Sequence, residues 1–95
     1  LTNNVADLVE VSTATIDELD PTTFDVVFAN IGAATLCSMA EELVRVTKPE
    51  GVLVLSGLLG EQVETVIESF EQSGALRTEV RADGEWRTVL MKRPR

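Results

Sequence analysis

The sequence contains no histidine, and it has a single cysteine, Cys37. Without histidine, a Ser-His or Cys-His nucleophilic mechanism cannot operate within this chain. One cysteine cannot form an intramolecular disulfide, and neither a second cysteine nor a histidine completes a metal-binding set. Cys37 falls on a predicted helix, where we expect a buried apolar role rather than a nucleophilic one. These absences are no objection to chemistry that needs neither a metal nor a strong nucleophile.

Basic residues are also scarce, since eight Lys and Arg stand against sixteen Asp and Glu, for a formal net charge of −8. This balance argues against electrostatic binding of nucleic acid or of an anionic membrane. It is compatible with a basic partner, and equally with a charge that only keeps the protein soluble. Apolar runs are too short for a membrane span and no signal-peptide pattern opens the sequence, so we expect a cytoplasmic protein.

The hydrophobic pattern predicts alternating strands and helices. Short crossovers through helices require parallel middle strands, whereas the Asp83-Gly84 turn predicts a final antiparallel hairpin. The chain is therefore expected to form an α/β fold with a mixed sheet and flanking helices. Its predicted strands are 7–11, 25–29, 52–56, 76–81 and 86–92, and its predicted helices are a single capped turn at 15–18, then 35–47 and 61–73.

Asn30 directly follows the apolar strand 25–29. In open α/β sheets, ligands bind beyond the carboxyl ends of the strands. The amide oxygen of an Asn at this point can accept a hydrogen bond from a substrate amine, although an Asn at a loop start also commonly bonds its own backbone. Ser56 and Gly57 end the next strand and should lie beside Asn30, either as substrate-binding residues or as a turn into the following helix.

Three motifs carry a family resemblance. Residues 24–31, F-D-V-V-F-A-N-I, resemble the F-D-[LV]-[LV]-V-A-N-[IL] stretch of the ribosomal protein L11 methyltransferases (PrmA-type), which are class I S-adenosylmethionine-dependent enzymes. Residues 48–59, K-P-E-G-V-L-V-L-S-G-L-L, are similar to that family's K-P-G-G-x-[LF]-[IL]-L-S-G-[IL]-L, with Glu50 in place of one glycine. Glu85-Trp86 resembles the family's E-W before the last strand.

The resemblance implies a partial Rossmann-like methyltransferase sheet, in which residues 1–95 form the C-terminal half of the catalytic domain. It further implies S-adenosylmethionine as cofactor, and N-methylation of amines on a basic ribosomal protein. The family's glycine-rich cofactor loop is absent from this chain. The chain alone is therefore expected to be inactive.

The same resemblance assigns roles to individual residues. Asn30 would orient the substrate amine as the catalytic residue and would also contact the cofactor. Ile31 and Gly32 would shape the acceptor channel, and Ser56 and Gly57 would line its substrate side. Thr13 would contact the adenine.

Other polar and aromatic residues of the chain are better explained by structural roles. Thr15 is better explained as the cap of the helical turn at 15–18. We expect Trp86 to be part of the core, with an acceptor-side contact as the minor alternative. The glutamates of the second long helix are expected to form a solvated face rather than an acid/base pair.

Two alternatives compete with the methyltransferase interpretation. One is a non-catalytic binding or assembly module, and the other is half of a different Rossmann-like enzyme such as a dehydrogenase. The terminal hairpin and Asn30-Ile31 argue against the second. In the family that the chain resembles, the strand carrying Asn30 pairs with a strand that precedes the glycine loop. Since that strand is missing, we expect 25–29 to be an exposed apolar edge through which the chain dimerises or swaps strands.

Overall fold

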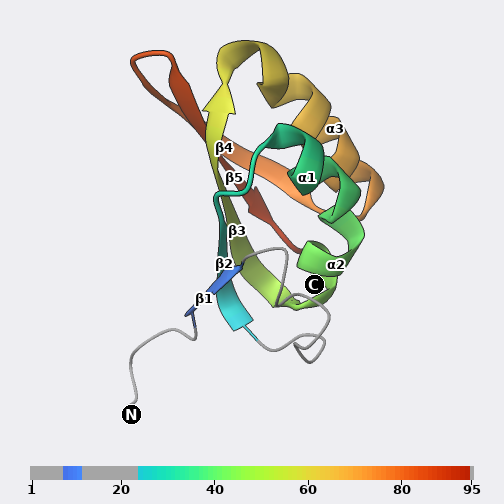
Figure 1. Cartoon of the computed structure of the whole chain (residues 1–95). Coiled ribbons are helices and arrows are strands. Elements are labelled where there is room, and N and C mark those ends of the chain that lie inside the picture. The colour runs from blue at the N-terminus through green and yellow to red at the C-terminus, as the bar shows by residue number, and fades with distance from the viewer. Residues whose placement is uncertain (1–7, 12–23, 95) are drawn as a thin grey trace.

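The computed structural model describes residues 8–11 and 24–94. Five strands form one sheet in the order β1-β2-β3-β5-β4, and three α-helices pack on it (Figure 1). The strands are β1 (Leu8–Val11), β2 (Phe24–Ala29), β3 (Thr47–Leu59), β4 (Leu76–Asp83) and β5 (Trp86–Lys92). The helices are α1 (Ala33–Ser38), α2 (Ala40–Arg45) and α3 (Val63–Gln72), and a 3₁₀ turn, η2 (Gly60–Gln62), precedes α3.

The directions of the strands agree with the expected mixed sheet. β1 and β3 both pair in parallel with β2, whereas β5 pairs antiparallel with β3 and with β4. Gly84 has a φ of 63° in the turn between β4 and β5, which confirms the Asp-Gly hairpin. Gly74, with a φ of 103°, follows α3 as the predicted C-terminal glycine.

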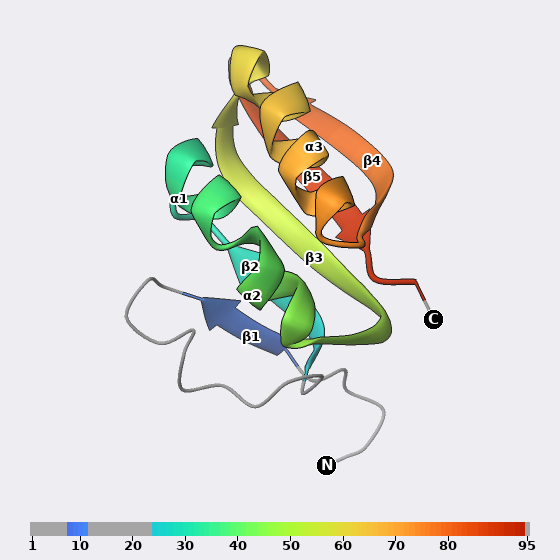
Figure 2. The same ribbon diagram turned by 90° about the vertical axis from the view of Figure 1, so that its right-hand side faces the viewer.

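The helices cover one face of the sheet (Figures 1 and 2). Alternate residues of the three central strands point to this face because side chains in a strand alternate between its two faces. Each of these fully buried side chains contributes about 1.5–3 kcal/mol of hydrophobic stabilisation if it is a Val, Leu, Ile, Phe or Met. The buried residues of the sheet are Val27, Ala29, Leu53, Leu55, Val89 and Met91, and those of the helices include Leu36, Leu43, Val66, Ile67 and Phe70.

The opposite face of the sheet is also apolar, but it is more exposed. Phe28, Val54 and Leu90 lie next to one another across β2, β3 and β5, and each is only half-buried. Val26 and Val52 form a second half-buried pair on this face. No helix in the described part of the chain lies over it (Figure 1). A sheet with parallel strands usually has both faces covered.

The predicted helix at 35–47 is wrong in its continuity and in its end. The chain forms two short helices that meet at Met39, whose φ and ψ are −107° and 9°. Ser38 donates a side-chain hydrogen bond to the carbonyl of Thr35 at 2.9 Å, directly before this break. Thr47 begins β3 instead of ending the helix, although its hydroxyl donates to the Leu43 carbonyl at 2.8 Å.

β3 is longer than the predicted strand 52–56, because the residues expected to form a turn before it pair with its neighbours. Phe24 pairs with Thr47, and the register shifts before Val26 pairs with Val52. Glu50 has a φ of 67° within this irregular segment. A second irregularity, between Leu55 and Leu58, falls where β3 pairs with β5. The strand thus absorbs both breaks as bulges rather than ending at them.

The expectation that residues 25–29 form an exposed edge is wrong. β2 lies between β1 and β3, with Leu8 opposite Val26 and Val11 opposite Ala29. The short strand near the N-terminus thus supplies the partner that the family resemblance assigns to an upstream strand. The edges of the sheet are β1 and β4. β2 therefore has no unpaired edge through which the chain could exchange strands. The predicted helical turn at 15–18 lies outside the described residues.

Candidate functional site

Asn30 lies directly after β2, at the edge of the sheet where β2 and the second half of β3 end. β5 begins at this same edge, since Trp86 pairs with Leu59. The hairpin of β4 and β5 extends past this edge (Figure 1). Three consecutive strands of the sheet therefore bring side chains to one place, as the carboxyl ends of an open α/β sheet do.

A cleft of about 420 Å³ lies at this edge. Its volume is in the range of sites for small molecules. An amide, two hydroxyls and a carboxylate line it, together with an indole and a glycine. The carboxylate is the one ionisable group among them. The lining residues are Asn30, Ser56, Gly57, Asp83, Trp86 and Thr88.

Gly57 and Asn30 touch within the cleft. Gly57 has a φ of 78°, a conformation that residues with a Cβ rarely adopt. A Cβ at this position would collide with the Oδ1 atom of Asn30 and would lie 3.2 Å from its Cγ. The bulge in β3 between Leu55 and Leu58 gives Gly57 this backbone. The absence of a side chain at Gly57 therefore makes room for the amide of Asn30.

Ser56 and Thr88 join β3 to β5 through their side chains. Their hydroxyl oxygens lie 3.4 Å apart, and either one can donate to the other. Each hydroxyl still has acceptor capacity that this single contact does not use. Together with the amide of Asn30, they give the cleft three neutral polar side chains.

The predicted site residues divide into three groups. Asn30, Ser56 and Gly57 line one cleft, as their positions at adjacent strand ends predict. Ile31 packs partly against the core, Gly32 is the N-cap residue before α1 with a φ of 87°, and neither lines this cleft. Thr13 lies outside the described residues, so its expected adenine contact stays a prediction.

Two lining residues were not found from the sequence, and one was assigned wrongly. Asp83 and Thr88 were not selected as site residues, and Trp86 was expected in the core but is 51% exposed. The alternation of side chains along β5 could have predicted Thr88, because Trp86, Thr88 and Leu90 share one face of the sheet. Asp83 is paired with Trp86 across the hairpin and therefore lies at the same cleft.

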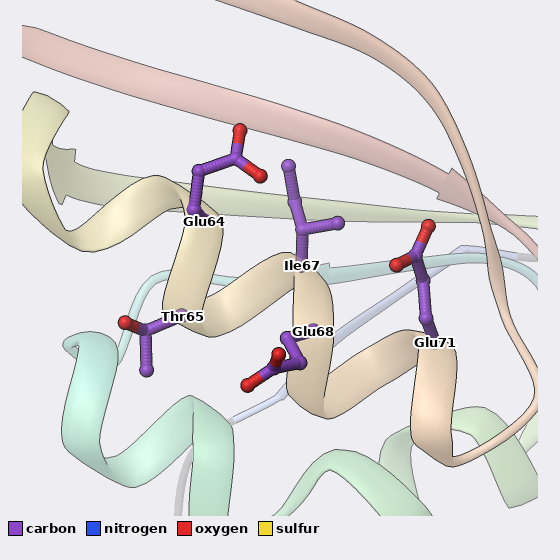
Figure 3. A pocket seen from close by; sticks show the side chains of 5 residues that line it. All are labelled: Glu64, Thr65, Ile67, Glu68 and Glu71. Carbon is purple, nitrogen blue, oxygen red and sulfur yellow. The ribbon is translucent and has the colours of Figure 1, made fainter.

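A second hollow follows α3, but it lacks the features of a site. It is lined by Glu64, Thr65, Ile67, Glu68 and Glu71 (Figure 3). Glu64 and Glu71 point to the same side of the helix as Ile67, whereas Thr65 points to the other side (Figure 3). Glu64 pairs with Arg77 at 3.2 Å. These glutamates are exposed, which agrees with the expected solvated face.

Residues 8–11 and 24–94 contain neither a candidate metal-binding cluster nor a membrane-spanning helix. Within these residues, no three His, Cys, Asp or Glu side chains cluster closely enough to hold a metal ion. No helix there is both long and apolar enough to cross a membrane. Cys37 is half-buried against the core, with its sulfur 4.0 Å from the carbonyl oxygen of Thr65, as expected of a packing residue.

Comparisons with known proteins agree with the geometry. A family described as "Ribosomal protein L11 methyltransferase (PrmA)" matches residues 1–94. The relative of this name from Geotalea daltonii is 42% identical over 89 residues, which are 94% of this chain and 28% of the relative. The chain therefore spans less than a third of the length of this curated relative.

Solved structures share the fold at low sequence identity. A ribosomal protein L11 methylase from Lactobacillus delbrueckii subsp. bulgaricus has a TM-score of 0.70 at 20% identity, and the match covers 77% of this chain and 38% of that one. A T. thermophilus 16S rRNA methyltransferase in complex with AdoMet and guanosine has a TM-score of 0.61 at 17% identity, over 84% of this chain and 23% of that one. The sheet is thus that of the Rossmann-like methyltransferases.

Proposed function

The chain belongs to the ribosomal protein L11 methyltransferase (PrmA) family, and from this premise we propose that it forms the acceptor side of a methyltransferase that modifies amines of a basic ribosomal protein. The observation that carries the proposal is the position of Asn30. Its amide lies in the cleft at the carboxyl end of β2, held against Gly57, within the sequence motif that resembles the family.

The residues of the cleft fit the proposed cofactor, S-adenosylmethionine, at its reacting end. When bound, this cofactor supplies a methyl group that is already activated by a sulfonium. Transfer to nitrogen is an in-line displacement that depends mainly on alignment, at about 3–3.5 Å between the reacting atoms. The Oδ1 atom of Asn30 can accept a hydrogen bond from the acceptor amine and direct its lone pair. This chemistry requires neither a metal nor a histidine.

We also propose that residues 1–95 are the C-terminal half of a longer catalytic domain. The chain spans 28% of its Geotalea relative, and the glycine-rich loop that the resemblance implies is not in the sequence. The half-buried face carrying Phe28, Val54 and Leu90 supports the proposal, because a second layer of helices would cover it. We further propose that the reaction takes place in the cytoplasm, because the proposed substrate is a ribosomal protein.

A chimeric enzyme tests the proposed activity. The N-terminal portion of the Geotalea daltonii relative is joined to residues 1–95, and methyl incorporation into a lysine-rich ribosomal peptide is followed by mass spectrometry. We expect the chimera to be active. Asn30→Ala should lower kcat about 100-fold with little change in KM for the peptide, because the lost contact acts on alignment.

The matched control is Gln72→Ala, which removes an exposed amide at the end of α3 that does not line the cleft. It should retain the rate of the unmodified chimera. A chimera that folds and binds S-adenosylmethionine but transfers no methyl group would favour the non-catalytic module. Full activity in the Asn30→Ala chimera would refute the assigned role of Asn30.

A further inference from the structure

Asp83 is the one ionisable residue among those that line the cleft. It ends β4, pairs with Trp86 across the hairpin turn, and is exposed. The other lining groups are an amide, two hydroxyls, an indole and the backbone of Gly57, all of which are neutral. Selection for the charge of a ligand in this cleft therefore depends on Asp83.

We propose that Asp83 selects the acceptor: its carboxylate attracts a positively charged alkylamine into the cleft and stabilises the charge on the nitrogen after methylation. The inference rests on the proposed function, since it concerns the same cleft. The bound ammonium first loses one proton to water, which frees the nitrogen lone pair. The lone pair then forms the new bond to carbon as the carbon–sulfur bond breaks. The positive charge thus moves from sulfur to nitrogen, and a proton on the nitrogen then passes to water. A carboxylate beside the cleft favours this charge movement.

Trp86 adds to the same preference. Trp86 lines the cleft and is 51% exposed. A cation over the face of an indole is attracted by the ring quadrupole, and this attraction includes methylated ammonium groups, which cannot donate hydrogen bonds once fully methylated. Asp83 and Trp86 come from opposite strands of the hairpin, so one short turn sets the two residues opposite each other at the cleft.

Two arginines of the hairpin, Arg81 and Arg87, have other partners, and Arg81 pairs with Glu79 at 2.7 Å. The guanidinium of Arg87 donates to the carbonyl oxygens of Gly84 and Trp86 at 2.8 and 2.9 Å. Arg87 does not line the cleft. It pairs with Leu58, a buried residue, whereas its neighbours Trp86 and Thr88 face the cleft. Arg87 therefore holds the turn rather than competing for Asp83.

Tryptophan fluorescence tests the inference directly, because Trp86 is the single tryptophan and the chain has no tyrosine. The 95-residue protein is titrated with Nα-acetyl-lysine methylamide, with its Nε-trimethyl form, and with the neutral analogue Nα-acetyl-norleucine methylamide. We expect a saturable change in Trp86 emission with both cations and a much weaker response to the norleucine probe. Equal responses to all three probes would overturn the inference.

Variants then assign the preference to Asp83. Asp83→Asn keeps the shape of the side chain and should weaken binding of both cations about fivefold, the effect of losing an exposed ion pair. The control Glu68→Gln removes the same charge from α3, outside the cleft, and should leave the affinity unchanged. Equal weakening by both variants would show a general effect of net charge and refute the role of Asp83.

The test also separates this inference from the proposed function. Amine binding is read on the chain alone, whereas methyl transfer is read in the chimera. A chimera that is active while Trp86 does not respond to cations would contradict the role of Asp83 and leave the activity intact. Charge-selective binding by the chain with an inactive chimera would support the role of Asp83 and contradict the proposed activity. Nuclear magnetic resonance of the Asn30 side-chain amide provides a second report from the same cleft.

Discussion

Gly57 lies against the side-chain amide of Asn30, with no room between them for a methyl group. The two residues come from the ends of neighbouring parallel strands, β2 and β3. Their contact fixes where the amide oxygen lies in the cleft and therefore where an acceptor nitrogen would be held. The left-handed backbone of Gly57, at a φ of 78°, is part of the same arrangement.

Gly57→Ala should therefore impair both folding and the site. A Cβ in the left-handed region costs about 1–2 kcal/mol of stability. The same Cβ displaces the amide of Asn30, so kcat of the chimera should fall about as far as in Asn30→Ala, by roughly 100-fold. Denaturant unfolding and steady-state methylation measure the two effects.

Gly60→Ala is the matched control for Gly57→Ala. A Cβ at Gly60 would lie 3.6–3.8 Å from atoms of the Arg87 guanidinium, which is ordinary contact. It should change neither the stability nor the rate by much. If Gly57→Ala kept the full rate, or if both variants lost it equally, the contact with Asn30 would not be what positions the amide.

The two faces of the sheet predict different costs for the same substitution. Phe70 on α3 is fully buried between the helices and the sheet, whereas Phe28 on β2 is half-buried on the open face. Phe70→Ala should cost about 3–5 kcal/mol of unfolding free energy, because it leaves a cavity. Phe28→Ala should cost about 1 kcal/mol in the isolated chain, because less apolar surface is lost from the interior.

The comparison becomes more informative in the chimera. If an added layer of helices covers the open face there, Phe28→Ala should become nearly as costly as Phe70→Ala. Urea unfolding of both variants in both proteins gives the four values needed. An unchanged cost for Phe28→Ala in the chimera would contradict the proposal that this face is covered in the longer domain.

The sequence predicted the elements that depend on local pattern. The strand ending at Ala29, the buried stripe of α3 and the Asp-Gly hairpin follow from hydrophobic period and turn chemistry, and all three are confirmed. The meeting of Asn30 with Ser56 and Gly57 was also predictable, because parallel strands end at one edge of a sheet.

What the sequence did not predict depends on pairing between distant segments. The place of β1 beside β2 is a choice of partner, which periodicity does not encode. The length of β3 depends on bulges opposite its neighbours. Asp83 and Thr88 became site residues only through the register of β5 against β3 and β4.

Arg93 should contribute more to the free energy of unfolding than an arginine in an exposed ion pair does. Its guanidinium donates to the carbonyl oxygens of Val44, Arg45 and Thr47 at 3.2, 3.3 and 2.7 Å, where α2 ends and β3 begins. Arg93→Ala leaves these carbonyls without that donor and should cost about 1.5–3 kcal/mol. Thermal or urea unfolding, followed by circular dichroism, measures the loss.

Two further variants separate geometry from charge at this position. Arg93→Lys keeps the charge but loses the planar fork, so it should recover only part of the stability. Arg81→Ala removes an arginine that forms an exposed ion pair with Glu79 and should cost less than about 1 kcal/mol. Full recovery in Arg93→Lys would show that charge at the end of α2, rather than the three-carbonyl contact, stabilises this corner.

The backbone of Glu50 gives the last prediction. Glu50 has a φ of 67°, which makes it the one non-glycine residue with positive φ in the described part of the chain, and it replaces a glycine of the motif that residues 48–59 resemble. Glu50→Gly and Glu50→Ala both remove the side chain and its contacts, so the difference between them isolates the backbone. The glycine variant should be the more stable by about 1 kcal/mol, because alanine retains the left-handed strain. Urea unfolding of the pair decides it, and an alanine variant as stable as the glycine variant would mean that this turn relaxes out of the left-handed region.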